Sequence, residues 1–306
     1  MHAKRPDHPV RPPVVYPLLF FGLMSFSISP ILVRFAAEAP GLAVAVWRTG
    51  LAVLMLAPFA LPRIGAEVRA FTPRERLLIL AAGVMLGLHF VTWIESLYHT
   101  SVASASVILS VTPLLLGLFG YWLLGEPLTR RLVASILLAM TGTALIAWGD
   151  SVDERAVGSL FGNGLALAAA CFQCFYLLIG RVIRRRTSWL AYVFPLYLVA
   201  ALTTLATALL RGVSLLGYDP IIYVLCGLMA LLPQITGHGS FNYALRYFTA
   251  ALLGLLALTE PVVASWLAYL LFDEIPTGIA LAGMVVVLVS VAVVLIRRRP
   301  ARVETT

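Results

Sequence analysis

The sequence is poor in charged residues, which make up 12% of its 306 positions. A soluble domain carries about 25% charged residues, so this scarcity argues against a water-soluble globular protein. Lysine is almost absent, since Lys4 is the single lysine among 22 basic residues. The net charge of +8 could suggest a nucleic-acid partner, but the positions of the arginines favour a different explanation. We therefore predict no nucleic-acid partner.

Cysteine is also rare, and Cys171, Cys174 and Cys226 all lie in apolar stretches. They therefore provide no disulfide framework. Cys171 and Cys174 form a C-x-x-C pair, but a redox pair needs an exposed thiolate and a zinc site needs further ligands. We predict no metal site and no cofactor.

Long apolar runs dominate the chain, which is 61% hydrophobic. Runs of about 20 residues are long enough to cross roughly 30 Å of hydrocarbon. They predict ten transmembrane helices, at 14–33, 41–61, 76–98, 102–124, 131–149, 158–180, 189–210, 221–245, 250–272 and 277–296. The first run is too long for the apolar region of a signal peptide, so it is expected to remain as a helix.

The basic residues are concentrated in alternate loops. Eighteen lie on one side of the predicted membrane and three on the other, with Arg48 inside a span. The positive-inside rule then places both termini in the cytoplasm, with tails at 1–13 and 297–306. The clusters RVIRRR and RRRPAR are explained by this orientation and by attraction to anionic lipid headgroups. The expected location is the cytoplasmic (inner) membrane, with the lipid bilayer as partner.

The two halves of the chain resemble each other at an offset of 148 residues. The offset superposes the mid-helix prolines Pro113 and Pro261, and it superposes Glu126 on Glu274 within a shared Glu-x-x-Thr. The repeats comprise residues 14–149 and 158–296. Because each contains five helices, the second enters the membrane from the opposite side, which produces an inverted repeat. The predicted fold class is an all-α membrane protein of two inverted five-helix repeats.

Two segments carry a family resemblance. ESLYHTSVASASVILSVTPLLLGLFGYWLLGEPLT and NYALRYFTAALLGLLALTEPVVASWLAYLLFDEIPT resemble the paired signature of EamA-type members of the drug/metabolite transporter superfamily. SPILVRFAAEAPGLAVAVWRTGLA, which contains Arg48, resembles the opening hairpin of that family. The resemblance covers 14–296. It implies ten helices around a central cavity and transport of small metabolites, commonly export of amino acids or related compounds.

Glu260 is the first candidate for a substrate-binding residue. It lies about ten residues into the ninth predicted helix, and its counterpart in the first repeat is Thr112. A charged group in hydrocarbon costs several kcal/mol, roughly 2.5 to 3.5 on insertion scales. Glu260 is therefore interpreted as a proton carrier or as a partner for a cationic substrate group. The alternative is a neutral carboxyl hydrogen-bonded between helices.

Two histidines lie midway along the third and eighth predicted helices. His89 and Trp93 are four residues apart, as are His238 and Asn242, so each pair occupies one helix face. Both faces are predicted to line one cavity and bind substrate. The alternatives are histidines bonded to backbone carbonyls and an interfacial role for Trp93.

Glycine and proline mark two further features. Pro233, Gly237 and Gly239 surround His238, and such interrupted spans expose backbone groups at transporter sites. We expect a bent, gating helix there. Gly83 and Gly87 have the spacing of a close helix contact.

Arg48 and Glu95 are predicted to lie at similar depths near the external surface. One interpretation is a structural ion pair. In the other, Arg48 receives a substrate carboxylate through its bidentate fork and Glu95 orients it. Both alternatives stay open at this point.

The sequence thus predicts a secondary transporter, most simply an exporter of small metabolites such as amino acids, working by alternating access with protons as a candidate coupling ion. Uptake is an alternative. A further alternative is an intramembrane metal-dependent enzyme with His89, His238 and Glu260 as zinc ligands. No H-E-x-x-H or comparable spacing supports it, so the chain is not expected to be an enzyme.

Overall fold

The computed structural model describes residues 11–100, 102–150, 160–272 and 275–296. Within these ranges every regular element is a helix. Ten segments are long and apolar enough to cross a membrane, which confirms the predicted spans. Glu274 and nearly all of both predicted tails lie outside the described residues.

The helices divide into the two predicted repeats. The first contains α1 (Val15–Ser27), α2 (Ser29–Phe35), α3 (Gly41–Arg69), α4 (Pro73–His99), α5 (Val102–Leu109), α6 (Thr112–Leu124) and α7 (Arg130–Asp150). The second contains α8 (Leu160–Ile183), α9 (Trp189–Leu210), α10 (Pro220–Met229), the π-helix η1 (Ala230–His238), α11 (Gly239–Ala244), α12 (Ala250–Ala257), α13 (Glu260–Phe272) and α14 (Gly278–Leu295).

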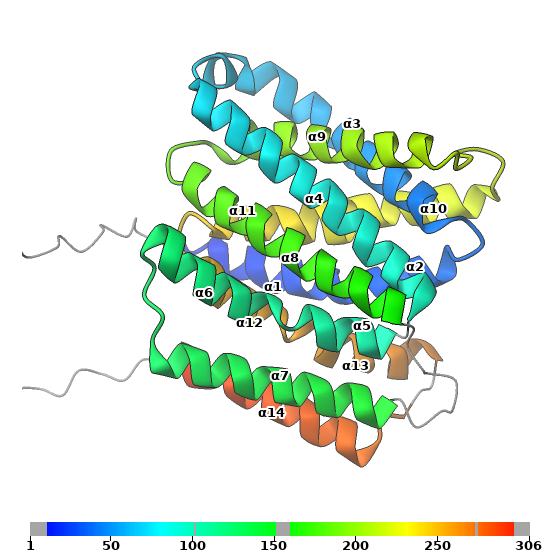
Figure 1. Cartoon of the computed structure of the whole chain (residues 1–306), viewed down its shortest axis with the longest axis vertical. Coiled ribbons are helices and arrows are strands. Elements are labelled where there is room, and N and C mark those ends of the chain that lie inside the picture. The colour runs from blue at the N-terminus through cyan, green and yellow to red at the C-terminus, as the bar shows by residue number, and fades with distance from the viewer. Residues whose placement is uncertain (1–10, 101, 151–159, 273–274, 297–306) are drawn as a thin grey trace, which may run out of the picture.

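The repeats are inverted with respect to each other. α1 begins and α14 ends at the same end of the bundle, on the left of Figure 1, which we name the terminal end. α8 begins at the opposite end, which we name the far end. Equivalent helices of the two repeats therefore run in opposite directions.

Prolines divide three of the spans into two helices each. Pro30, Pro113 and Pro261 occupy the second positions of α2, α6 and α13. Proline has no N–H, so the carbonyl four residues earlier loses its helical partner. At Pro113 that carbonyl belongs to Leu109, and it accepts a 2.7 Å hydrogen bond from the Thr112 hydroxyl. The continuous helices predicted here are therefore wrong in this detail.

The eighth span is interrupted as predicted, but by a π-helix. η1 contains Pro233 and connects α10 to α11. A π-helix has its hydrogen bonds between residues five apart, and such turns are frequent at functional sites. The backbone carbonyl of Gln234 accepts a 2.7 Å hydrogen bond from the Tyr197 hydroxyl of α9. The interruption is therefore fixed by a neighbouring helix.

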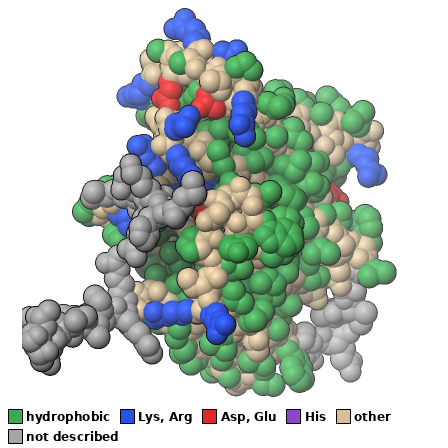
Figure 2. All heavy atoms as spheres, turned by 60° about the vertical axis from the view of Figure 1, so that its left-hand side comes forward, with side chains coloured by type: hydrophobic (Ala, Val, Ile, Leu, Met, Phe, Trp, Pro, Cys, Tyr) green, Lys and Arg blue, Asp and Glu red, His purple; other side chains and the backbone are tan. Residues whose placement is uncertain are grey.

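The outer surface matches a lipid environment. Large apolar side chains are exposed along the spans, among them Phe20, Phe59 and Trp122. Figure 2 turns the terminal end toward the viewer and shows arginine side chains gathered there beside a broad hydrophobic surface. Which side of the membrane this end faces stays a prediction from the arginine distribution.

Small residues allow α4 and α9 to pack closely, as the sequence predicted. A Cβ atom added to Gly83 would lie 2.5 Å from the Val199 Cβ atom. One added to Gly87 would lie 2.7 Å from the Thr203 Cβ atom and 2.9 Å from the Ala200 carbonyl oxygen. The two helices therefore touch at distances that glycine alone permits.

We expect Gly87→Ala to lower the yield of folded protein sharply, because overpacking a tight contact costs about 1 to 3 kcal/mol or more. Gly50→Ala is the matched control, since a Cβ atom there meets nothing within 4 Å. The measurement is the monodisperse fraction in fluorescence-detected size-exclusion chromatography. Equal yields of the two variants would contradict the close contact.

A second glycine contact joins α7 and α14, the fifth helices of the two repeats, which lie side by side at the lower edge of Figure 1. A Cβ atom on Gly142 would lie 2.8 Å from the Gly283 carbonyl oxygen, and one on Gly283 would lie 2.6 Å from that of Gly142. We name this backbone contact the glycine seam. It joins the repeats away from the centre of the bundle.

A buried ion pair joins the repeats at the terminal end. Arg181 of α8 donates from Nε to Glu126 Oε1 over 2.6 Å, and the two residues are 4% and 7% exposed. Arg181 also donates to the carbonyl of Leu245, just after α11. Glu126 reaches this position because Gly125, at φ +63°, ends α6 in a left-handed turn. The pair thus connects the end of α6 to α8 and α11.

A candidate substrate cavity between the repeats

The structure contains a cavity between the two repeats with about 790 Å³ of empty space, its open mouth included. It is lined by Phe26, Ser29, Arg48, His89, Phe90, Trp93, Ser106, Leu109, Ser110, Thr112, Pro113, Gln173, Leu177, His238, Phe241, Gly254, Ala257, Leu258, Glu260 and Pro261. The lining is mostly apolar with a few polar groups, as is usual for small-molecule sites. It collects residues from both repeats.

Arg48 of α3 lies in the wall of this cavity and is 1% exposed. Its guanidinium carbon lies 4.3 Å from the centre of the Phe90 ring. Nε donates to Gln234 Oε1 at 3.3 Å, and Nη1 donates to the Ser29 hydroxyl at 3.4 Å. All three contacts are with neutral groups, so they orient the guanidinium without neutralising its charge.

The two predicted histidines meet in the same wall, with ring centroids 5.9 Å apart. His89 Nδ1 lies 3.0 Å from the Ala169 carbonyl oxygen. A carbonyl only accepts, so Nδ1 carries the proton and Nε2 is left as an acceptor. His238 Nδ1 lies 2.7 Å from the Tyr176 hydroxyl. In each histidine, Nδ1 is thus bonded to a neighbouring helix, and Nε2 is left for another hydrogen-bond partner.

Glu260 lines the cavity from the first position of α13. A helix N-terminus carries partial positive charge and stabilises a carboxylate nearby. The break that creates this terminus is braced by Ser27, whose hydroxyl donates to the Glu260 backbone carbonyl at 3.1 Å. The proline break therefore places a carboxyl at a helix end within the membrane.

Thr112, the repeat counterpart of Glu260, also lines the cavity, at the first position of α6. Its hydroxyl lies 3.4 Å from Oε1 of Gln173 in α8. The breaks at Pro261 and Pro113 thus each contact the first helix of the other repeat, through Ser27 and Gln173 respectively. The architecture is symmetric, but the carboxyl belongs to one half only.

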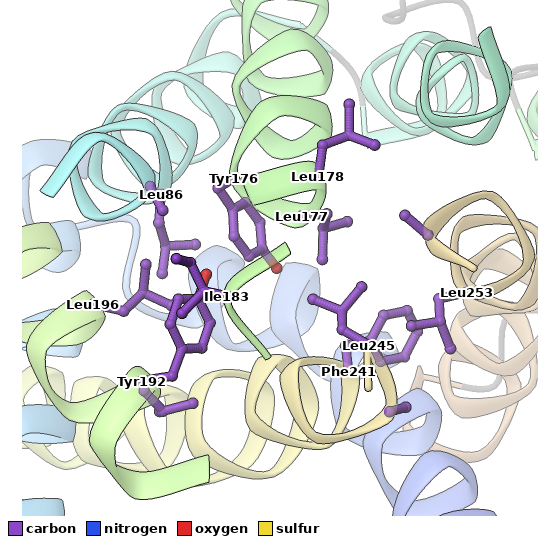
Figure 3. Close-up of a cluster of buried hydrophobic side chains, with 14 of the residues drawn as sticks. Leu86, Tyr176, Leu177, Leu178, Ile183, Tyr192, Leu196, Phe241, Leu245 and Leu253 are labelled. Carbon is purple, nitrogen blue, oxygen red and sulfur yellow. The ribbon is translucent and has the colours of Figure 1, made fainter. Parts of the chain in front are cut away.

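A cluster of buried apolar side chains borders the cavity on the side of the terminal end. Figure 3 shows this cluster, in which side chains from α4, α8, α9, α11 and α12 converge. Leu177 and Phe241 belong both to the cluster and to the cavity lining. In the other direction the lining reaches Ser106, one turn into α5 from the far end. The cavity therefore extends from the middle of the bundle toward the far end.

Two predicted site residues lie elsewhere. Asn242 is buried but is outside the cavity lining, one turn beyond His238 toward the terminal end, where the apolar cluster fills the space. Glu95 makes no ion pair with Arg48 in the described structure, and its Oε2 lies 3.8 Å from His99 Nε2 instead. The ion pair with Arg48, one of the two interpretations left open by the sequence, is therefore not formed among the described residues. Glu95 lies beside Gly41 at the start of α3, seven residues before Arg48, so the two side chains are not at the same depth.

The cavity lining includes Arg48, His89, Trp93, His238 and Glu260. That these residues bind substrate stays a prediction. Sequence reasoning missed two glutamines near these residues, the half-buried Gln173 and the fully buried Gln234. A signal for both was present, because a polar side chain within a span is costly and commonly functional.

Comparison with known proteins supports this description. The EamA-like transporter family matches residues 14–148 and 160–296. The uncharacterized transporter YxxF of Bacillus subtilis (strain 168) is 27% identical over 249 residues, which cover 76% of this chain and 74% of that protein. The pseudopaline exporter CntI of Pseudomonas aeruginosa is 24% identical over 285 residues, 87% of this chain and 90% of that one.

A shorter match, 29% identical over 94 residues, covers 28% of the uncharacterized transporter YetK of B. subtilis. A solved structure titled "Crystal structure of protein" superposes with a TM-score of 0.77 at 18% identity, covering 92% of this chain and 96% of that one. That likeness concerns the fold alone. Because the family matches both repeats over most of the chain, this multi-pass membrane protein belongs to the EamA-like transporter family.

Proposed function

We propose that this transporter exports small carboxylate-bearing metabolites, such as amino acids or related amphipathic compounds, across the cytoplasmic membrane by alternating access coupled to protons. The observation that carries the proposal is one inter-repeat cavity that contains both a buried guanidinium, which forms no ion pair with a described residue, and a carboxyl group. Arg48 and Glu260 form no ion pair with each other in the described structure. Each is therefore available to a ligand.

Arg48 suits a carboxylate because its planar fork can donate two parallel hydrogen bonds. Its guanidinium lies over the Phe90 ring, a favourable cation–π position. A ligand carboxylate would supply the negative charge that the wall lacks. This selects for anionic or zwitterionic compounds.

Glu260 suits either an ammonium group or a proton. A carboxyl in a cavity open to one side of a membrane changes its charge as the cavity changes access, and intramembrane carboxyls form the proton relays of pumps and transporters. His89 and His238 provide imidazole nitrogens in the same wall. The three groups together support proton coupling.

Export is favoured over uptake by the relative named as a pseudopaline exporter. Catalysis has less support, because family membership points to transport. In addition, no group of three potential metal-ligating side chains forms among the described residues. The flux experiment described below distinguishes export from uptake.

The test begins with a thermal-shift screen of the detergent-purified protein against amino acids, nucleosides, sugars and polyamines, since a ligand stabilises the state that binds it. Ligands that stabilise the protein are then assayed in proteoliposomes with and without a pH gradient. We expect Glu260→Gln to lower gradient-driven flux about tenfold or more while substrate exchange continues, because a general proton-transfer group contributes about 100-fold or more to the step it serves.

The matched control is Glu38→Gln, which removes an exposed carboxylate outside the cavity. It should transport as the wild type does. Unchanged pH dependence in Glu260→Gln would contradict proton coupling through this carboxyl. Substrate accumulation in the reverse direction would establish uptake instead of export.

A further inference from the structure

Gln234 contacts Arg48 in the cavity wall. It lies in the π-helix η1 and is 0% exposed. Its Oε1 accepts from Arg48 Nε at 3.3 Å, while its backbone carbonyl accepts from the Tyr197 hydroxyl at 2.7 Å. The residue is thus held at its backbone and in turn holds Arg48.

The other amide atom of Gln234 is informative. Nε2 is buried and has no hydrogen-bond partner among the described residues. An unpartnered buried donor costs about 1 to 3 kcal/mol. A glutamate at this position would replace that donor by a second carboxylate oxygen, so it would lose no hydrogen bond and would give Arg48 a counter-ion. A glutamate at this position would therefore give a more stable protein than the glutamine that is present.

The remaining contacts of Arg48 lead to the same conclusion. Its other contacts are the Ser29 hydroxyl and the Phe90 ring, both neutral. Glu260 interacts with Arg48 electrostatically, but the two form no ion pair among the described residues. A guanidinium has five N–H donors, of which these contacts occupy few. The groups in direct contact with Arg48 thus orient it without pairing with its charge.

We propose that Gln234 is a positioning residue that determines specificity. Its amide fixes Arg48 in the cavity wall and, by being neutral, reserves the positive charge of Arg48 for the carboxylate of the substrate. The inference rests on the proposed function for the identity of the substrate group. The π-helix contributes to this positioning, because its backbone is bonded to α9 at Gln234 and so places the Gln234 side chain beside Arg48.

The test compares Gln234→Glu with Gln234→Leu. We expect Gln234→Glu to raise the melting temperature of the ligand-free protein, because Arg48 gains a counter-ion. We also expect it to weaken binding of L-alanine, L-glutamate and acetate at least tenfold, which is about 1.4 kcal/mol. Gln234→Leu should lower the melting temperature, because the Nε donor of Arg48 loses its acceptor. Putrescine serves as the ligand without a carboxylate.

Gln173→Glu is the control for charge alone, since it adds a carboxylate to the cavity wall next to Thr112 rather than Arg48. It should not raise the melting temperature. A fall in melting temperature for Gln234→Glu, like that of Gln234→Leu, would overturn the proposal, as would undiminished binding of the carboxylates. If Gln234→Glu raises the melting temperature but no carboxylate stabilises the wild type, the positioning role is supported and the proposed substrate class fails.

Discussion

Arg48→Met is expected to weaken the binding of carboxylate-bearing ligands by about 30-fold or more. Removing one partner of a buried, hydrogen-bonded charge pair costs about 2 to 5 kcal/mol, and 1.4 kcal/mol corresponds to about a factor of ten. The methionine removes a buried cation, but it also leaves the buried Gln234 Oε1 without its donor. The affinity, and not the melting temperature, is therefore the informative quantity for this variant. Titration calorimetry of the purified protein measures the affinities.

Two further arginine variants sharpen this experiment. Arg48→Lys keeps the charge but loses the planar fork, so an intermediate loss of affinity is expected. Arg211→Met removes an exposed arginine at the end of α9 and should bind as the wild type does. If Arg48→Met retains wild-type affinity for carboxylates, the ligand does not bind to Arg48.

Glu126→Ala is expected to lower the free energy of unfolding by about 3 to 5 kcal/mol, because it leaves Arg181 buried without its partner. Arg181 is 4% exposed and has a single ion-pair partner in the described structure. Thermal unfolding in detergent, followed by intrinsic fluorescence, measures the change. The loss should be much larger than that from removing an exposed carboxylate, such as Glu38→Ala.

The double variant Glu126→Leu with Arg181→Met is the matched control. Replacing both partners of a buried pair by apolar residues is often neutral or stabilising, by about 1 to 4 kcal/mol. We therefore expect it to unfold at a temperature near that of the wild type. A double variant as unstable as Glu126→Ala would mean that the geometry of the pair, and not the orphaned charge, decides stability.

Much of the fold could be predicted because its physical cause is local. A run of about 20 apolar residues crosses the membrane whatever its neighbours are, so the ten spans follow from hydropathy. Pro113 and Pro261 revealed the repeat because a mid-helix proline is rarely shared by chance. The same prolines divide their spans, which the hydropathy of those spans could not show.

The site was harder to predict because it depends on the direction in which each side chain points around its helix axis. Arg48 and Glu95 were predicted at similar depths, yet Arg48 lines the cavity beside Phe90. Glu95 lies beside Gly41 at the start of α3 and contacts His99. Gln234 was missed because its contact with Arg48 depends on η1, and a π-helix arises from packing that one sequence does not reveal. Asn242 shares a predicted helix face with His238, but the cavity ends between them.

The glycine seam has a consequence for the divergence of the two halves after duplication. A side chain at Gly142 collides with the backbone at Gly283, and the reverse is also true. A mutation at one position cannot be compensated by a smaller residue at the other, because glycine is already the smallest. The seam therefore restricts the mutational freedom of α7 and α14, even though Glu260 and Thr112 show that the halves have become chemically different at the cavity.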